Sequence, residues 1–271
     1  MTTKVFTQQN AAIPKTLDHT SGAYVEREGA QIYYEVAGQE SGPALVLLHG
    51  GMGTLEDFQS ILPDLLARYK IIGIDSRGHG RSTLHGPVTY AHMQKDVEGI
   101  LAHLGIQNVT LMGFSDGGTV AYRLAAMSSI HVENLVTIGA HWHVKNMDSM
   151  KEFCLKITGE SWRQKFPHTY ELYQKLNPTP DFDGLVQSVI HLWLDPHPSG
   201  YPYEAVQKIT CPTLVVRGED DHLCLEQDAR QVAGLIQNAR LIQIPSAGHQ
   251  AFEDQKDIFM THLNGFLGRE Q

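Results

Sequence analysis

The sequence has 271 residues, enough for one large α/β domain or two ordinary domains. It contains 21 Lys and Arg against 30 Asp and Glu, and the resulting net charge of −9 argues against a nucleic-acid partner, because a phosphate backbone attracts basic surfaces. The residues at 1–10 are polar, and no run of about 18 apolar residues occurs. We therefore expect a cytoplasmic protein that does not bind a membrane.

Cysteine and histidine usage gives no sign of a disulfide framework or a metal centre. Cys154, Cys211 and Cys224 form an odd set without C-x-x-C spacing, which is typical of packing residues in a reducing compartment. The histidines are scattered, and His141 and His143 lack a third ligand nearby. We predict no metal and no cofactor; the oligomeric state is left open.

Short apolar runs alternate with segments of helical periodicity along most of the chain. The runs predict strands buried on both faces of a sheet, at 44–48, 71–74, 109–112, 135–138, 213–216 and 241–244. The periodic segments predict covering helices, at 55–68, 90–104, 119–127, 226–236 and 255–267. This alternation indicates an α/β fold in which helices flank a mostly parallel sheet.

One segment, residues 141–209, interrupts the alternation and is rich in aromatic side chains. Phe166, Tyr170 and Tyr173 lie at i, i+4 and i+7, which predicts one face of a helix, and such stripes are more often core than binding surface. We predict that residues 1–140 and 210–271 form an α/β core and that 141–209 form a helical cap that shapes a pocket.

The segment GFSDG at 113–117 follows one predicted strand and opens a helix, which is the context of a nucleophile elbow. A serine on such a strained turn needs neighbours without side chains, and Gly113 and Gly117 meet that need. The helix N-terminus favours a developing oxyanion. We predict Ser115 as the nucleophile; for this motif alone a plain glycine-rich turn is the alternative.

A serine nucleophile needs a general base and an acid that orients it. His249 follows the predicted strand at 241–244, where a loop returns to the carboxyl edge of the sheet. The acidic run at 219–221 follows the strand at 213–216, and Asp220 and Asp221 are both candidates for the acid, whereas Glu219 is expected to face solvent. The order Ser, acid, His, each after a strand, is that of a catalytic triad.

An oxyanion hole requires two backbone N–H donors. We predict Asp116 as the first donor and Gly51, in the loop after the strand at 44–48, as the second, with Met52 as a neighbour that shares this task. Met52, Asp116 and Trp142 are also our candidate substrate contacts. We interpret His49 as a brace for this loop.

The loop at 75–82 is glycine-rich, but its spacing matches neither G-x-G-x-x-G nor a P-loop. We therefore interpret it as a structural turn held by Asp75 and Arg77 rather than as a phosphate site.

From about Tyr24 to Leu267 the sequence resembles the α/β-hydrolase superfamily, through HGG at 49–51, the loop at 75–82, the elbow, and the downstream acid and histidine. The resemblance implies an eight-stranded sheet with a helical cap, and hydrolysis through an acyl-enzyme formed on Ser115. In the family the acid lies three residues after a glycine, which favours Asp221, counted from Gly218.

More narrowly, GFSDGG at 113–118 resembles the elbow of the valacyclovir hydrolase and biphenyl-hydrolase-like group. There the acidic residue after the nucleophile holds the α-amino group of the substrate. For Asp116 this implies an α-amino acid ester as a candidate substrate. A helix N-terminal acid stabilised by the helix dipole is an equally weighted interpretation.

These observations favour a serine hydrolase of carboxylesterase type that cleaves a small carboxylic ester, or a related amide or thioester. One alternative is a carbon–carbon bond hydrolase of the ring-fission-product type, which uses a similar triad. A second is a hydrolase-fold ligand receptor, although nothing in the sequence demands a protein partner.

Overall fold

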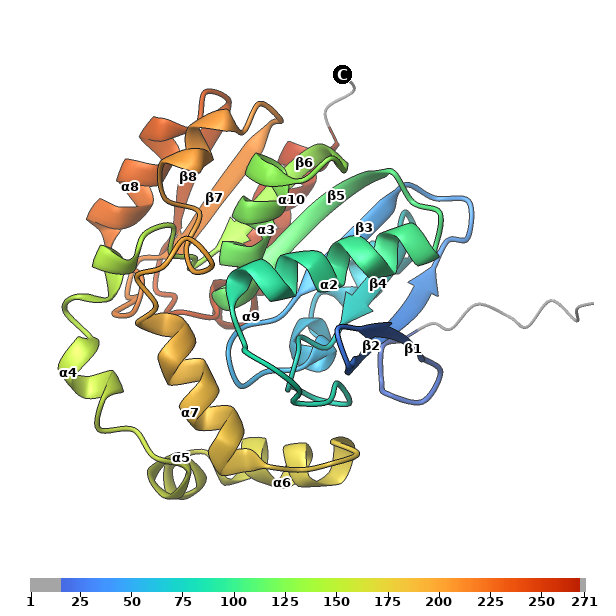
Figure 1. Cartoon of the computed structure of the whole chain (residues 1–271). Helices are drawn as coiled ribbons and strands as arrows, with labels where there is room; N and C mark the ends of the chain where they lie inside the picture. Colours follow the sequence, from blue (N-terminus) through green and yellow to red (C-terminus); the bar gives the residue numbers. More distant parts are fainter. Residues whose placement is uncertain (1–15, 269–271) are drawn as a thin grey trace, which may run out of the picture.

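The computed structural model describes residues 16–268, which form an eight-stranded sheet flanked by helices (Figure 1). The strand order is β1-β2-β4-β3-β5-β6-β7-β8, with β2 antiparallel to both neighbours and all other pairs parallel. The strands are β1 (Ala23–Arg27), β2 (Ala30–Gly38), β3 (Ala44–Leu48), β4 (Lys70–Ile74), β5 (Asn108–Phe114), β6 (His131–Ile138), β7 (Thr213–Gly218) and β8 (Ala239–Ile244). The predicted α/β class and mostly parallel eight-stranded sheet are confirmed. The polar segment at 1–10 lies outside the described residues.

The six predicted strands lie within β3 to β8, each of which contains a short apolar run. β3 to β7 are mostly buried between two layers of helices, whereas β8 is an edge strand and is only partly buried. Every residue of β7 is buried. The two N-terminal strands, β1 and β2, are not predicted from the sequence. β1 is an edge strand and is largely exposed, so that its sequence is mixed rather than continuously apolar.

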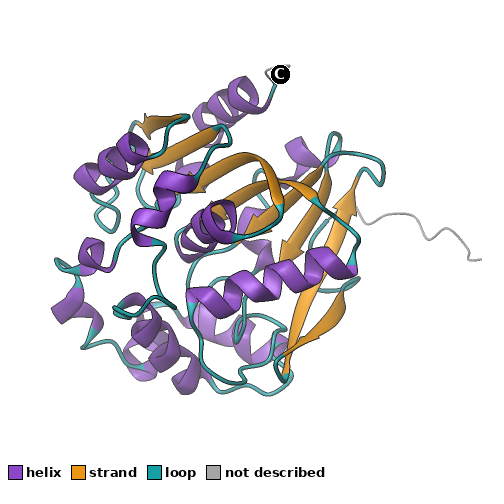
Figure 2. Cartoon of the chain, turned by 45° about the horizontal axis from the view of Figure 1, so that its top comes forward, coloured by secondary structure: helices purple, strands orange, loops and turns teal. Residues whose placement is uncertain are grey.

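Helices cover both faces of the sheet, and each layer encloses its own core (Figure 2). On one face the layer consists of α2 (Tyr90–His103), α3 (Asp116–Met127) and α8 (Glu226–Leu235). On the other it consists of the 3₁₀ helix η1 (Leu55–Phe58), α1 (Leu62–Leu66), α9 (Ala251–Asp254) and α10 (Lys256–Leu267). Within residues 16–268, no helix combines the length and apolarity that a membrane span requires.

The helix predicted at 55–68 is divided into η1 and α1, which corrects the sequence-based expectation. Pro63 lies at the start of α1 and has no backbone N–H. It therefore cannot donate to the carbonyl of Gln59, as a continuous α-helix would require. The chain restarts its helical geometry at Leu62 instead.

A run of helices is inserted between β6 and β7 and lies beyond the carboxyl ends of the parallel strands (Figure 1). We call residues 144–193 the inserted helices. They are η2 (Val144–Met147), α4 (Lys151–Cys154), α5 (Gly159–Lys165), α6 (Pro167–Leu176) and α7 (Phe182–Trp193). The 3₁₀ helix η3 (Tyr203–Lys208) follows, and Tyr201, Val206 and Ile209 pack in the core beside α3. The segment between β6 and β7 thus leaves the sheet through the inserted helices and returns to it through η3.

The predicted aromatic face of Phe166, Tyr170 and Tyr173 is only partly formed. Tyr173 is buried in a small core of the inserted helices, and the rings of Tyr170 and Tyr173 both contact Phe182. Phe166 lies instead at the junction of α5 and α6 with its side chain 41% exposed. The following Pro167 disfavours helical geometry at Phe166, whose φ and ψ are −131° and 66°.

Candidate active site

Ser115 lies on the turn between β5 and α3, with φ 51° and ψ −116°. This backbone conformation is strained for a residue with a side chain. The turn is tight enough that a Cβ at Gly113 would collide with the carbonyl oxygen of Gly117, and a Cβ at Gly117 would collide with that of Leu48. The two glycines are therefore required for the turn, as the sequence predicts for a nucleophile elbow.

Ser115, His249 and Asp221 form a continuous hydrogen-bonded chain. The Ser115 hydroxyl donates to Nε2 of His249 over 3.0 Å, and Nδ1–H of His249 donates to Oδ2 of Asp221 over 2.8 Å. His249 lies in the loop after β8, and Asp221 in the loop after β7. The His249 ring packs against Gly139, where a Cβ would lie 2.9 Å from the ring atoms Nδ1 and Cε1.

Asp221 is buried, whereas Glu219 and Asp220 are exposed. Burial alone would raise the pKa of Asp221, but hydrogen bonds from His249 and from the backbone N–H groups of Leu223 and Cys224 outweigh it and hold the pKa below its usual value. This carboxylate is therefore ionised at neutral pH. Of the candidate acids, the structure brings only Asp221 to His249.

The loop after β3 lies against the elbow. A Cβ at Gly50 would lie 3.2 Å from Cβ of Ser115, and one at Gly51 would lie 2.5 Å from Oδ2 of Asp116. Within residues 16–268, no protein group accepts a hydrogen bond from the backbone N–H of Gly51 or Asp116. Both donors are thus unoccupied beside the serine, which is the property that an oxyanion hole needs.

His49 fixes the loop that carries Gly51. Its Nδ1–H donates to the carbonyl oxygen of Gly50 over 2.7 Å, and its Nε2 accepts from the backbone N–H of Ser76 over 2.9 Å. Both ring nitrogens of this buried histidine therefore have backbone partners, in keeping with its interpretation as a brace.

The loop at 75–82 is held by its own buried side chains. The two carboxylate oxygens of Asp75 accept from the backbone N–H groups of Leu55 and Arg81. Arg77 is almost fully buried and forms two hydrogen bonds with Asp96, of 3.0 and 2.6 Å. These contacts fit the structural turn that the sequence indicates.

Asp116, the first residue of α3, is buried and accepts hydrogen bonds from two distant side chains. The Tyr90 hydroxyl donates to Oδ1 over 2.7 Å, and the indole N–H of Trp193 lies 3.0 and 2.9 Å from Oδ1 and Oδ2. Burial raises the pKa of Asp116, and the hydrogen bonds from Tyr90 and Trp193 oppose this shift. Both donors are neutral, so they do not balance the carboxylate charge.

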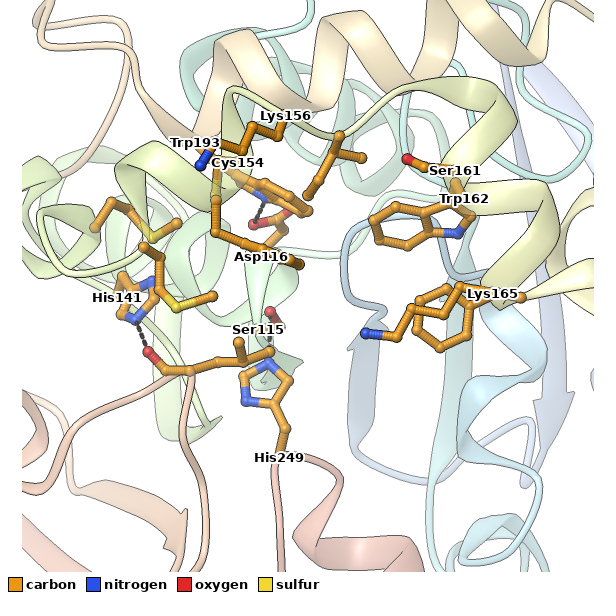
Figure 3. A pocket seen from close by; sticks show the side chains of 16 residues that line it. Ser115, Asp116, His141, Cys154, Lys156, Ser161, Trp162, Lys165, Trp193 and His249 are labelled. Carbon is orange, nitrogen blue, oxygen red and sulfur yellow. Dashed lines mark hydrogen bonds between the residues drawn. The ribbon is translucent and has the colours of Figure 1, made fainter.

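A cavity of about 340 Å³ opens above Ser115, Asp116 and His249 (Figure 3). Its walls come mainly from the inserted helices. The remaining lining residues are His141, Met147, Met150, Phe153, Cys154, Lys156, Ile157, Ser161, Trp162, Lys165, Phe166, Trp193 and Leu223. Most of these side chains are apolar, as is usual for a small-molecule site with a few convergent polar groups.

Two predicted substrate contacts are placed elsewhere. Trp142 is 5% exposed and packs in the core beside α3, because it lies between the end of β6 at Ile138 and the first inserted helix. Met52 packs with Tyr173 and Phe182 and lines a second cavity, of about 260 Å³, on the other side of the loop. Neither residue lines the cavity above Ser115, whereas Asp116 does.

Several residues that shape this site are not predicted from the sequence. Trp193 and Tyr90 hold Asp116, but they come from helices far apart in sequence, and no local pattern marks the contact. His141 lines the cavity with Nε2 3.1 Å from the carbonyl oxygen of Leu223, and burial lowers its pKa to about 4. Gly139, at φ 57°, directly follows a predicted strand, and a glycine at the carboxyl end of a strand could have indicated a turn beside the site.

Comparison with known proteins agrees with this fold. The family model described as alpha/beta hydrolase fold matches residues 43–256. The chain is 26% identical to the proline iminopeptidase PfmaB of Pestalotiopsis fici, over 90% of this chain and 98% of that protein. It is 24% identical to the esterase YbfF of Escherichia coli, over 84% of this chain and 94% of that protein.

Solved structures with the same fold cover nearly the whole chain. An esterase from Exiguobacterium antarcticum superposes with a TM-score of 0.75 at 25% identity, covering 92% of this chain and all of that one. A hydrolase from Pseudomonas aeruginosa superposes with a TM-score of 0.77 at 22% identity, covering 93% of this chain and all of that one. At the latter identity the likeness concerns the fold.

Proposed function

The chain belongs to the α/β-hydrolase fold family, and on that premise we propose that it is a serine hydrolase that cleaves a small carboxylic ester through an acyl-enzyme. The observation that carries the proposal is the hydrogen-bonded chain Asp221–His249–Ser115 at the floor of a largely apolar cavity. The relatives named as an esterase and an iminopeptidase support ester or amide bonds as the target class.

In the proposed reaction, Oγ of Ser115 attacks the ester carbonyl carbon while its proton moves to Nε2 of His249. Asp221 holds the imidazole in the tautomer that accepts this proton and stabilises the imidazolium. The backbone N–H groups of Gly51 and Asp116 stabilise the oxyanion. His249 then gives the proton to the departing alkoxide, and a water molecule activated by His249 releases the acid and restores the Ser115 hydroxyl.

We further propose that the inserted helices act as a cap over the reacting groups. They lie within residues 141–209, the segment that the sequence predicts to be a cap separate from the α/β core. They supply most of the cavity wall. A cavity of about 340 Å³ is at the lower end of the range for small-molecule sites, which favours a small ester over a polymer.

Within the ester class, we propose that Asp116 receives a substrate α-amino group. Its carboxylate is buried, lines the cavity beside Ser115 and is hydrogen-bonded by neutral donors. A buried charge without a counter-ion is costly, and a substrate ammonium group would supply that counter-ion.

The test is hydrolysis of 4-nitrophenyl acetate and butyrate by wild type and Ser115→Ala. We expect the substitution to lower kcat by roughly 10⁴-fold or more, because it removes the attacking atom. Ser128→Ala, at the opposite end of the same helix α3, is the matched control and is expected to retain wild-type rates. Turnover that survives Ser115→Ala would contradict the mechanism.

A further inference from the structure

Two lysines, Lys156 and Lys165, line the cavity above Ser115, and the contacts of Lys165 leave its charge available. We propose that Lys165 is a specificity-determining residue that binds an anionic group, foremost a carboxylate, at the end of the substrate remote from the scissile ester. This inference rests on the proposed ester hydrolysis and goes beyond it, because it assigns a charge and a shape to the substrate.

The position of Lys165 supports a role in the cavity. It is the last residue of α5 and lines the cavity together with Ser115 and His249. Figure 3 shows its ammonium group pointing into the cavity toward the side where Ser115 and His249 lie. The ammonium nitrogen lies 5.3 Å from the ring centre of Phe166 and 5.9 Å from that of Phe153. Two aromatic rings thus hold the cation in place by cation–π attraction.

Lys165 differs in its pairing from the other cation on the same helix. Arg163 forms ion pairs with Glu160 and Asp183, at 3.0 and 3.4 Å. Among the described residues, Lys165 has no carboxylate within ion-pairing distance. The only acidic side chain that lines the cavity is Asp116, and it is already held by Tyr90 and Trp193. The ammonium group is therefore free to pair with a ligand.

The rest of the cavity wall is mostly apolar and includes Ile157, Trp162 and Cys154. A substrate that spans this wall needs an apolar linker, because a polar group there would lose its hydrogen bonds to water without replacement. The chemistry that fits is a half-ester of a dicarboxylic acid, or another ester with a distal anionic group. One end reacts at Ser115 while the other end pairs with Lys165.

The experiment compares anionic and neutral esters of equal length. The substrates are the 4-nitrophenyl half-esters of adipic, pimelic and suberic acid, each paired with its methyl-capped neutral counterpart. We expect wild type to prefer the anionic member in kcat/KM at one or two chain lengths. Lys165→Met should lower kcat/KM for those half-esters by roughly two- to fivefold, the value of an exposed ion pair, and leave the methyl-capped esters unchanged. Lys165→Glu should reverse the preference.

Lys151→Met is the matched control, since it removes the same charge from neighbouring α4 at a residue that does not line the cavity. It should retain the wild-type preference. Three outcomes overturn the inference: no preference in wild type, an equal loss in Lys151→Met, or an equal loss on neutral and anionic esters in Lys165→Met. The last result would indicate a structural role. Ester hydrolysis by Ser115 is tested separately: if Ser115→Ala abolishes turnover of the neutral esters, that proposal holds even when the Lys165 variants do not show the predicted change in preference.

Discussion

The indole N–H of Trp193 lies within 3.0 Å of both carboxylate oxygens of Asp116, the residue next to Ser115. Trp193 is the last residue of α7, so this contact joins the inserted helices directly to the turn that carries the serine. A displacement of α7 would remove a hydrogen bond from a buried carboxylate. The position of the inserted helices and the state of the elbow are therefore linked.

Trp193→Phe keeps most of the ring but removes this donor. We expect the loss to destabilise the observed position of α7 by about 1 to 3 kcal/mol, which would raise KM about 5- to 150-fold for neutral and charged esters alike. Trp162→Phe is the matched control, because Trp162 lines the same cavity and its indole nitrogen has no partner among the described residues. Steady-state kinetics of the two variants measure the difference. Equal KM values would show that the hydrogen bond does not position the site.

Asp116→Asn removes the carboxylate charge while an amide oxygen can still accept from Tyr90 or Trp193. If Asp116 binds an ammonium group, kcat/KM for 4-nitrophenyl esters of alanine or valine should fall by roughly 10- to 100-fold, the scale of a hydrogen bond to a charged group. The corresponding esters without the amine should change little. A parallel fall for both series would assign Asp116 to holding Tyr90 and Trp193 alone.

The elbow is predicted to tolerate no side chain at Gly117. Gly117→Ala should lower the free energy of unfolding by about 2 kcal/mol or more, since the new Cβ would displace the backbone of Leu48. In contrast, a Cβ at Gly234 in α8 meets no atom within 4 Å, and Gly234→Ala should stabilise the protein by up to about 1 kcal/mol. Urea denaturation measures both values. A stable Gly117→Ala variant would contradict the packing described for the elbow.

His79 makes stability depend on pH. Burial lowers its pKa from 6.5 to about 3. Between these two pH values the unfolded chain binds a proton at this histidine and the folded protein does not. Protonation of the unfolded chain therefore does not reduce the free energy of unfolding above pH 6.5, and it reduces this free energy progressively as the pH falls toward 3. From pH 7 to pH 5, His79 should cost about 2 kcal/mol of unfolding free energy. His79→Gln should reduce the measured loss by that amount, and an unchanged loss would contradict the assignment.

The sequence was informative where one local segment determines the geometry. Each of the strands β3 to β8 contains a short apolar run, and the elbow needs glycines at two fixed positions, so both could be predicted. The positions of Asp221 and His249 followed from the rule that parallel strands end at one edge of the sheet.

The sequence was less informative where distant segments meet. Tyr90 and Trp193 are 26 and 77 residues from Asp116, and only the packing of α2 and α7 brings them to it. Trp142 lies within the predicted cap range but packs in the core, since it directly follows β6 and precedes the inserted helices. Which aromatic residues line the cavity depends on helix packing that no single segment encodes.

The central claim is that Ser115 is the nucleophile activated by His249. The most direct measurement is labelling of the intact protein with a fluorophosphonate, followed by mass spectrometry of the proteolytic peptides. We predict one covalent adduct, located on Ser115, with parallel loss of esterase activity, and much slower labelling in His249→Ala. An adduct on another residue, or an enzyme that remains active when Ser115 is fully labelled, would contradict the account.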